Sequence, residues 1–118
     1  DPRSGRPDAA RALAGAEAVR IVLMHAPSGL LSLGAHDFRV AFAGHTHGGQ
    51  ICLPGGTPVF VGSGPLSRKY AKGRFHVGNG RELVVSRGAG FSDLPIRAFS
   101  PPEVVVGTFL PRRSPSAS

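Results

Sequence analysis

The chain has 118 residues, of which 41% are hydrophobic, so it can bury a core and is ordinary in composition for a globular protein. It has no apolar run of about 18 residues and no recognisable signal peptide, which excludes a membrane-spanning helix within the sequence. Lysine and arginine number 14 against 7 acidic residues, and the net charge of +7 favours anionic partners such as phosphate esters, nucleic acids or acidic lipid surfaces.

The first part of the chain predicts a helix followed by a buried strand. The alanine-rich residues 9–16 favour a helix, with Asp8 near its positive N-terminal end. Residues 19–24 form a nearly continuous apolar run with β-branched members, which is typical of a strand covered on both faces. His25 follows at the carboxyl end of this strand, and Pro27 ends it.

A second strand is expected at residues 38–43. The link over residues 26–37 has about the dozen residues that a parallel crossover needs, and it could hold a short helix around residues 30–33. Two parallel strands end at the same edge of a sheet, where open α/β sheets place their ligands. Side chains that follow the two strands should therefore meet.

Three histidines occupy these strand ends. His45 and His47 are one residue apart, so in an extended chain both point to one face, and His25 emerges beside them. Neutral imidazole is the commonest side-chain metal ligand, so the pattern predicts a metal-binding cluster of all three. Two polar residues in a surface turn remain an alternative for the His-x-His pair.

The second half of the chain reads as strands and turns. Asn79-Gly80 is a strong hairpin signal between apolar runs. The single cysteine, Cys52, lies between Ile51 and Leu53 and is interpreted as a buried small hydrophobe, with a reactive thiol as the alternative. Expected strands cover residues 51–53, 59–61, 74–77, 81–86 and 103–110.

The central motif resembles a known family. Residues 44–50, Gly-His-Thr-His-Gly-Gly-Gln, follow an apolar strand and resemble the last metal-binding motif of the calcineurin-like metallophosphoesterases. Residues 21–27, Ile-Val-Leu-Met-His-Ala-Pro, are similar to that family's strand ending in a His-x-Pro ligand. Residues 83–90, 94–97 and 102–104 are similar to its closing strands, so the resemblance covers about residues 19–110.

The resemblance implies a fold and an activity. The expected fold class is α/β: the C-terminal half of a metallophosphoesterase β-sandwich with flanking helices, strand-rich in this chain and spanning residues 8–110. Residues 1–7 would be a flexible segment and residues 111–118 a disordered tail. The implied activity is hydrolysis of a phosphate mono- or diester at two divalent metal ions (Mn, Zn, Fe or Mg).

The implied ligand set is incomplete. His25 and His45 match ligands of one metal, and His47 matches a ligand of the other. The family's Asp-x-His, Gly-Asp and Asn-His motifs are absent from this sequence. The bridging carboxylate and the catalytic histidine are therefore expected in a missing N-terminal half of the domain, and this chain alone is expected to be inactive. Its start at Asp1, with Met24 as its only methionine, is interpreted as the sign of a fragment.

Two arginines are candidate substrate ligands. Arg87 and Arg97 could each hold a phosphate oxygen with a guanidinium fork, although a surface position is the alternative for both. Lys69 and Tyr70 are weaker candidates. The sequence leaves open the substrate and the location, cytoplasmic or membrane-associated through absent upstream segments.

Two other functions compete with the enzyme. One is a basic module that binds nucleic acid or anionic lipid without catalysis. With seven Phe, one Tyr and no Trp, few of them beside basic residues, the sequence lacks the aromatic interleaving that nucleic-acid binding favours. The other is a structural β domain with an incidental His-x-His. His36 and His76 are interpreted as exposed residues in either case.

Overall fold

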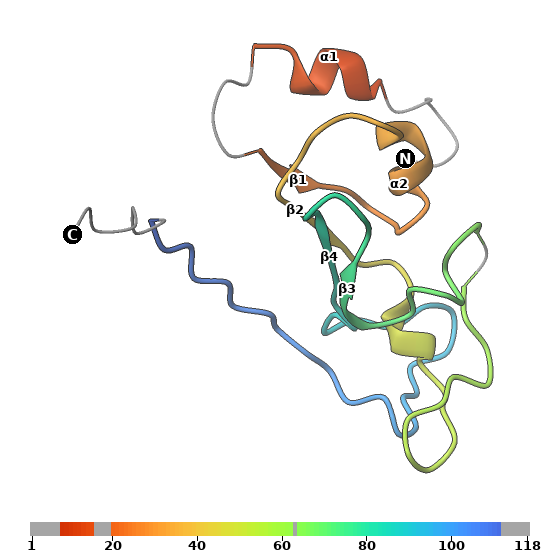
Figure 1. Cartoon of the computed structure of the whole chain (residues 1–118). Coiled ribbons are helices and arrows are strands. Elements are labelled where there is room, and N and C mark those ends of the chain that lie inside the picture. The colour runs from red at the N-terminus through yellow and green to blue at the C-terminus, as the bar shows by residue number, and fades with distance from the viewer. Residues whose placement is uncertain (1–7, 16–19, 63, 112–118) are drawn as a thin grey trace.

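A four-stranded mixed sheet forms the centre of the structure, a computed structural model that describes residues 8–15, 20–62 and 64–111 (Figure 1). The strand order is β1-β2-β4-β3. This confirms the predicted mixed α/β class. The elements in chain order are α1 (Ala9–Leu13), β1 (Ile21–Leu23), α2 (Gly29–Leu33), β2 (Val40–Ala43), the 3-10 helix η1 (His47–Gly49), β3 (Gly73–His76) and β4 (Glu82–Val85).

The two predicted helices are present and short. Asp8 caps α1, because its side chain accepts a hydrogen bond of 2.9 Å from the backbone N–H of Arg11. The helix α2 lies in the connection between β1 and β2, as predicted. No helix in the described part of the chain is long and apolar enough to cross a membrane.

The core lies between the helices α1 and α2 and one face of the sheet. The register pairs Ala41 of β2 with Leu83 of β4, and Ala43 with Val85, so these four side chains share a face. All four are buried, and they form one cluster with Leu33 of α2. Burial of this face fixes the register, since a slip of one residue would expose it.

Parallel pairing brings the ends of β1 and β2 together. Ile21 pairs with Val40 in a parallel register, so the predicted crossover through α2 is confirmed. The pairing continues past both strands, because the N–H of Gly44 donates to the carbonyl of His25 over 3.1 Å. The histidines that follow the two strands therefore start from neighbouring backbone positions.

The hairpin predicted at Asn79-Gly80 is confirmed. Strands β3 and β4 pair antiparallel, and Gly73 lies opposite Val85. Asn79 and Gly80 have φ angles of 50° and 69°, as a tight turn of this kind requires.

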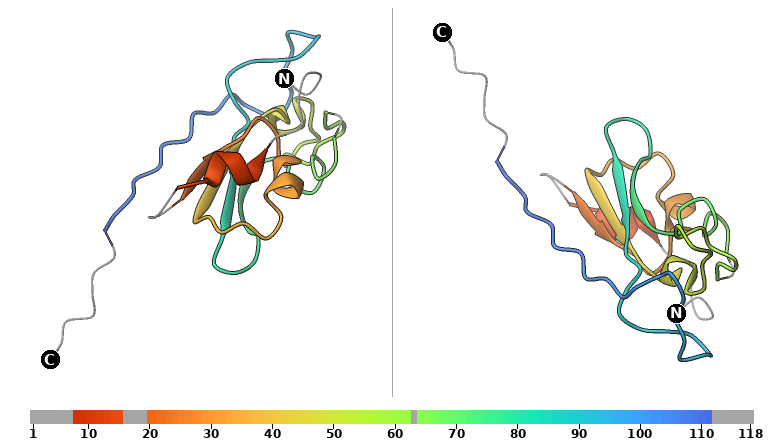
Figure 2. Two further views of the ribbon diagram at one scale, coloured as in Figure 1. Left: turned by 90° about the horizontal axis from the view of Figure 1, so that it is seen from above. Right: turned by 90° about the horizontal axis from the view of Figure 1, so that it is seen from below.

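Three other predicted strands are wrong. In place of strands at residues 51–53 and 59–61, the chain forms single bridges between Cys52 and Pro58 and between Ile51 and Ala98. Residues 103–110 carry β-branched side chains, but within the described residues they pair with no strand. They pass beside the sheet as an extended segment (Figure 2), and the Phe109 ring meets the Phe42 ring of β2 edge-on. Strand propensity alone does not make a strand where no partner edge is available. The predictions for residues 1–7 and 112–118 lie outside the described residues.

Candidate functional site

Two of the predicted ligand histidines face each other. His25 follows β1 and His45 follows β2, and His25 Nε2 lies 3.0 Å from His45 Nδ1. The ring centroids are 4.6 Å apart. Desolvation lowers the pKa of His25, and the charge of His45 lowers it further. The neutral imidazole, which is the form that binds metals, is therefore favoured at His25.

The third histidine turns to a different neighbour. His47 Nδ1 lies 3.2 Å from the carbonyl oxygen of Gly90, and its Nε2 lies 3.3 Å from Ser92 Oγ. A carbonyl only accepts, so in the neutral imidazole Nδ1 carries the proton and Nε2 presents its lone pair to the Ser92 hydroxyl. This contact fixes the tautomer and the orientation of the ring.

The predicted clustering is thus confirmed for His25 and His45 and not for His47. The i, i+2 argument assumed an extended chain, but His45 and His47 have φ angles of 71° and 51°, and η1 begins at His47. Within the residues that the structure describes, no three His, Cys, Asp or Glu side chains are grouped to hold one metal ion. The assignment of the three histidines as metal ligands remains a prediction.

Backbone strain is concentrated in the motif. Besides His45 and His47, Gln50 also has a positive φ, at 31°. Positive φ is uncommon outside glycine and costs about 1–3 kcal/mol per residue. Such strain persists only where surrounding contacts hold it, and it is typical of functional sites.

The remaining motif residues supply these contacts. Thr46 is buried, and its hydroxyl donates to the carbonyl of Ala71 over 2.6 Å. A Cβ at Gly48 would overlap the Arg87 side chain, and a Cβ at Gly49 would overlap Pro58. The motif therefore combines two imidazoles with the small residues that let neighbouring segments approach its backbone.

A substitution at Gly49 tests this packing. Gly49→Ala should lower the free energy of unfolding by about 2–4 kcal/mol, because a positive φ and the overlap with Pro58 both oppose the added methyl. Gly55→Ala is the matched control, since Gly55 has a similar φ of 94° but no atom within 4 Å of the place that an added methyl would take. Chemical denaturation should show a cost of only about 1 kcal/mol there. Equal losses for the two variants would contradict the packing argument.

Gln50 holds the loop that faces the histidines. Its Nε2 donates to the carbonyls of Leu94 and Ser92 over 2.8 and 3.2 Å, and its Oε1 accepts from the N–H of Ser92 over 2.8 Å. These bonds set the position of Ser92 against His47. The sequence reasoning missed both residues, although the place of Gln50 at the end of the motif was a usable signal.

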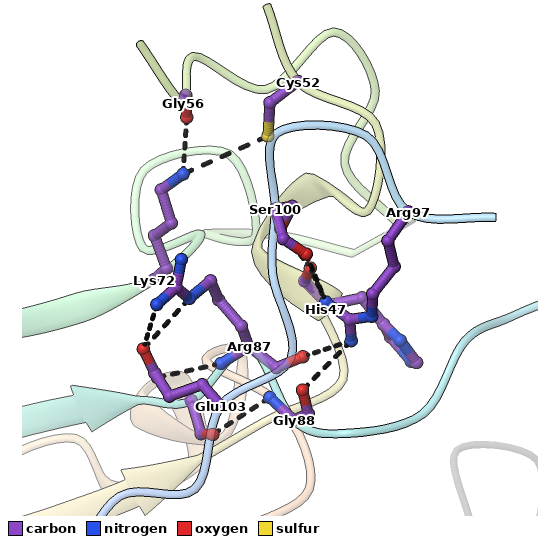
Figure 3. A network of polar contacts seen from close by, with 10 residues as sticks. His47, Cys52, Gly56, Lys72, Arg87, Gly88, Arg97, Ser100 and Glu103 are labelled. Atoms are coloured by element: carbon purple, nitrogen blue, oxygen red, sulfur yellow. Dashed lines mark hydrogen bonds and ion pairs between the residues drawn. The ribbon is translucent and has the colours of Figure 1, made fainter. Parts of the chain in front are cut away.

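The two candidate phosphate-binding arginines carry other contacts (Figure 3). The guanidinium of Arg97 donates to five backbone carbonyls, those of His47, Arg87, Gly88, Gly90 and Ser100. Arg87 forms an ion pair of 2.8 Å with Glu103. Burial would raise the pKa of Glu103, but its hydrogen bonds from Arg87 outweigh this and hold the pKa below its usual value. Substrate binding by either arginine stays a prediction and would require these contacts to be exchanged.

The lower-ranked candidates lie elsewhere. Lys69 lies over the Tyr70 ring, and together with His76 these residues line a separate hollow beside α2. His36 and His76 are exposed, as expected. Cys52 is buried, as expected, and its thiol donates to the carbonyl of Gly48 over 3.3 Å.

A pocket of about 170 Å³ opens beside the motif. His45 and His47 both contribute to its wall, and the loop held by Gln50 closes one side. Asp93 is the acidic residue of this wall. The other lining residues are Thr46, Gly49, Gln50, Ile51, Phe60, Gly62, Ser92 and Leu94.

The spacing of the facing histidine nitrogens is close to that of two imidazole ligands of one metal ion. Two imidazole nitrogens that bind one zinc ion at about 2.0–2.1 Å in a tetrahedral arrangement lie roughly 3.3–3.4 Å apart. The observed separation between His25 Nε2 and His45 Nδ1 is 3.0 Å, so a small ring movement gives that spacing. Imidazole nitrogen donors match the ligand preferences of Zn²⁺ and Fe²⁺.

Comparison with known proteins points to one family. The chain is 35% identical over 88 residues to the metallophosphoesterase YkuE of Bacillus subtilis, a match that covers 75% of this chain and 30% of the relative. It is 37% identical over 86 residues to a metallophosphoesterase of Campylobacter jejuni, covering 73% and 21%. It is also 37% identical over 93 residues to the UDP-2,3-diacylglucosamine pyrophosphatase LpxG of Chlamydia muridarum, covering 73% and 27%.

The chain thus spans less than a third of the length of these curated relatives. No protein-family model and no solved structure gives a significant match. The names of the relatives agree with the family that the motif resembles. The chain therefore belongs to the metallophosphoesterases, as a portion consistent with the C-terminal part of a calcineurin-like domain.

Proposed function

We propose that His25, His45 and His47 are ligands of a divalent-metal centre that hydrolyses phosphate esters in a longer protein. The facing pair of His25 and His45, with ring nitrogens 3.0 Å apart at the ends of two parallel strands, carries this proposal. The names of the relatives support the reaction class, and one of them is a pyrophosphatase.

The roles of the side chains follow from their contacts. Two divalent ions, if bound here, would polarise the phosphoryl oxygens and supply bound water as the nucleophile. His25 and His45 would hold one ion between them. The carbonyl of Gly90 keeps the proton of His47 on Nδ1, which leaves Nε2 available as a ligand in place of its contact with Ser92.

The ligand set of this chain is expected to be incomplete. A metal pair at fixed separation needs a bridging carboxylate, and the described residues offer no carboxylate grouped with two of the histidines. Asp93 lines the pocket but belongs to no such group. We infer that another part of the longer protein provides the bridge and the catalytic histidine.

The rival function, a basic binding module, receives less support from the arginines. Arg74 pairs with Glu82, Arg87 pairs with Glu103, and Arg97 is surrounded by carbonyls. Arg39 and Arg81 also donate to backbone carbonyls. Cations that are engaged in this way are less available to an extended anion.

Phosphodiester turnover tests the proposal. With Mn²⁺ and bis-p-nitrophenyl phosphate, the 118-residue chain should show no hydrolysis above background, while a longer protein that contains it should be active. His45→Ala in the longer protein should reduce turnover by roughly a hundredfold or more, and the exposed His76→Ala should not change it. Turnover in the longer protein that does not depend on His45 would contradict the proposed site. Robust turnover by the 118 residues alone would show that a carboxylate such as Asp37 or Asp93 completes the centre.

A further inference from the structure

The pocket beside the histidines has walls of two kinds. His45 and His47 form one part of the wall. The apolar side chains of Ile51, Phe60 and Leu94 form another part. Binding sites for small molecules commonly combine an apolar wall with a few polar groups that fix the orientation of the ligand. A ligand that fits both walls has a polar head and an apolar body.

The apolar wall belongs to a larger set of exposed hydrophobic side chains. Phe60 is 69% exposed and Leu94 is 57% exposed, so neither is part of the core. Single exposed hydrophobic residues are ordinary, but eight within two short segments call for an explanation. The eight are Ile51, Leu53, Val59, Phe60, Phe91, Leu94, Ile96 and Phe99.

The two segments that carry these side chains are joined to each other. Ala98 accepts a backbone hydrogen bond of 2.8 Å from Cys52 and donates one of 3.0 Å to Gln50. The hydrogen bonds from the Gln50 side chain to the carbonyls of Ser92 and Leu94 add a second connection. The two segments are therefore held together, and Ile51, Phe60 and Leu94 line the pocket beside His45 and His47.

A hydrolytic centre at the histidines constrains what can lie against this wall. If the rest of a longer protein covered Ile51, Phe60 and Leu94 where they line the pocket, it would also close the space that the substrate must enter. Under the proposed function, on which this inference rests, the wall faces the substrate. The phosphoryl group would lie at the histidines, and the alcohol part of the ester would lie on the apolar side chains.

We propose that this pocket binds phosphate esters whose alcohol part is a hydrocarbon chain, so that its substrate class is amphiphilic. Each methylene group that leaves water for the apolar wall should tighten binding about three- to fourfold. A hydrophilic ester such as glycerol phosphate lacks this contribution and should bind weakly.

A chain-length series tests the proposal. Isothermal titration calorimetry of the 118-residue chain with butyl, hexyl and octyl phosphate, below their micelle concentrations, should give a Kd that falls by about threefold to fourfold per methylene. Phe60→Ser combined with Leu94→Ser should flatten this dependence. Both side chains are exposed, so the fold should persist, and circular dichroism with thermal unfolding verifies that it does.

A matched control separates the pocket from general adsorption. Val104 and Val106 are 81% and 86% exposed and lie outside the pocket, so their double replacement by serine should leave the chain-length dependence unchanged. A dependence that falls equally in both double variants would overturn the proposal, because any exposed apolar surface would then suffice.

A wild-type series without chain-length dependence would also overturn it, because the apolar wall would then contribute nothing to binding. That result would leave metal binding at His25 and His45, which tests the proposed function, unaffected. Conversely, a chain-length dependence that persists while metal binding fails would refute the metal centre alone.

Discussion

Replacement of Arg97 by alanine should lower the free energy of unfolding by about 3–5 kcal/mol, a large part of the stability of a domain of this size. The guanidinium joins carbonyls from three separate places, His47 in the motif, the turn after β4 and Ser100. Without it these carbonyls lose their donor, and the segment at residues 86–100 loses its connection to the motif. Urea denaturation followed by circular dichroism measures the loss.

Two further variants make the result specific. Arg97→Lys keeps the charge but not the planar fork with its five N–H donors, so it should recover only a part of the stability. Arg74→Ala removes an arginine whose ion pair with Glu82 is solvent-exposed, and it should cost far less than Arg97→Ala. If Arg97→Ala cost no more than Arg74→Ala, the structural role assigned to Arg97 would be wrong.

Truncation of Leu83 should have an effect of similar size on the core. Leu83 is fully buried in β4 and lies opposite Ala41, so Leu83→Ala removes apolar contacts and leaves a cavity that costs about 2–5 kcal/mol. Leu23→Ala in β1 is the matched control, because Leu23 is 80% exposed and should cost about 0.5 kcal/mol or less. Comparable midpoints of thermal unfolding for the two variants would show that the core has been placed on the wrong face of the sheet.

The parts of the fold that the sequence predicted are those with local signals. The apolar run before His25, the crossover of about a dozen residues and the Asn79-Gly80 turn each restrict the backbone within a short window, and the strand, the crossover and the turn are confirmed. The predicted burial of that strand on both faces is wrong, because β1 lies at the edge of the sheet and leaves Ile21 and Leu23 exposed. Residues 103–110 show the opposite case. Their β-branched side chains favour a strand, but a strand also needs a partner edge, which the local sequence does not reveal.

The site shows the same division. Parallel strand ends predicted the meeting of His25 and His45, since that depends only on topology. The direction of His47 depends on left-handed backbone angles in the motif, which follow from contacts with distant residues such as Ala71 and Pro58. The hydrogen bonds from Arg97 to the carbonyl of His47 and from Gln50 to that of Leu94 likewise join the motif to a loop more than 40 residues away, beyond the reach of periodicity and spacing.

The most direct test of the metal centre is a Zn²⁺ titration of the untagged chain by isothermal titration calorimetry, repeated with three histidine variants. We expect Zn²⁺ to bind, and His25→Ala and His45→Ala each to weaken binding by roughly tenfold or more, because each removes one of the two facing nitrogens. His76→Ala, which removes an exposed imidazole on β3, should leave the affinity unchanged. Absence of zinc binding, or binding that is insensitive to His25 and His45, would contradict the assignment of these histidines to a metal centre.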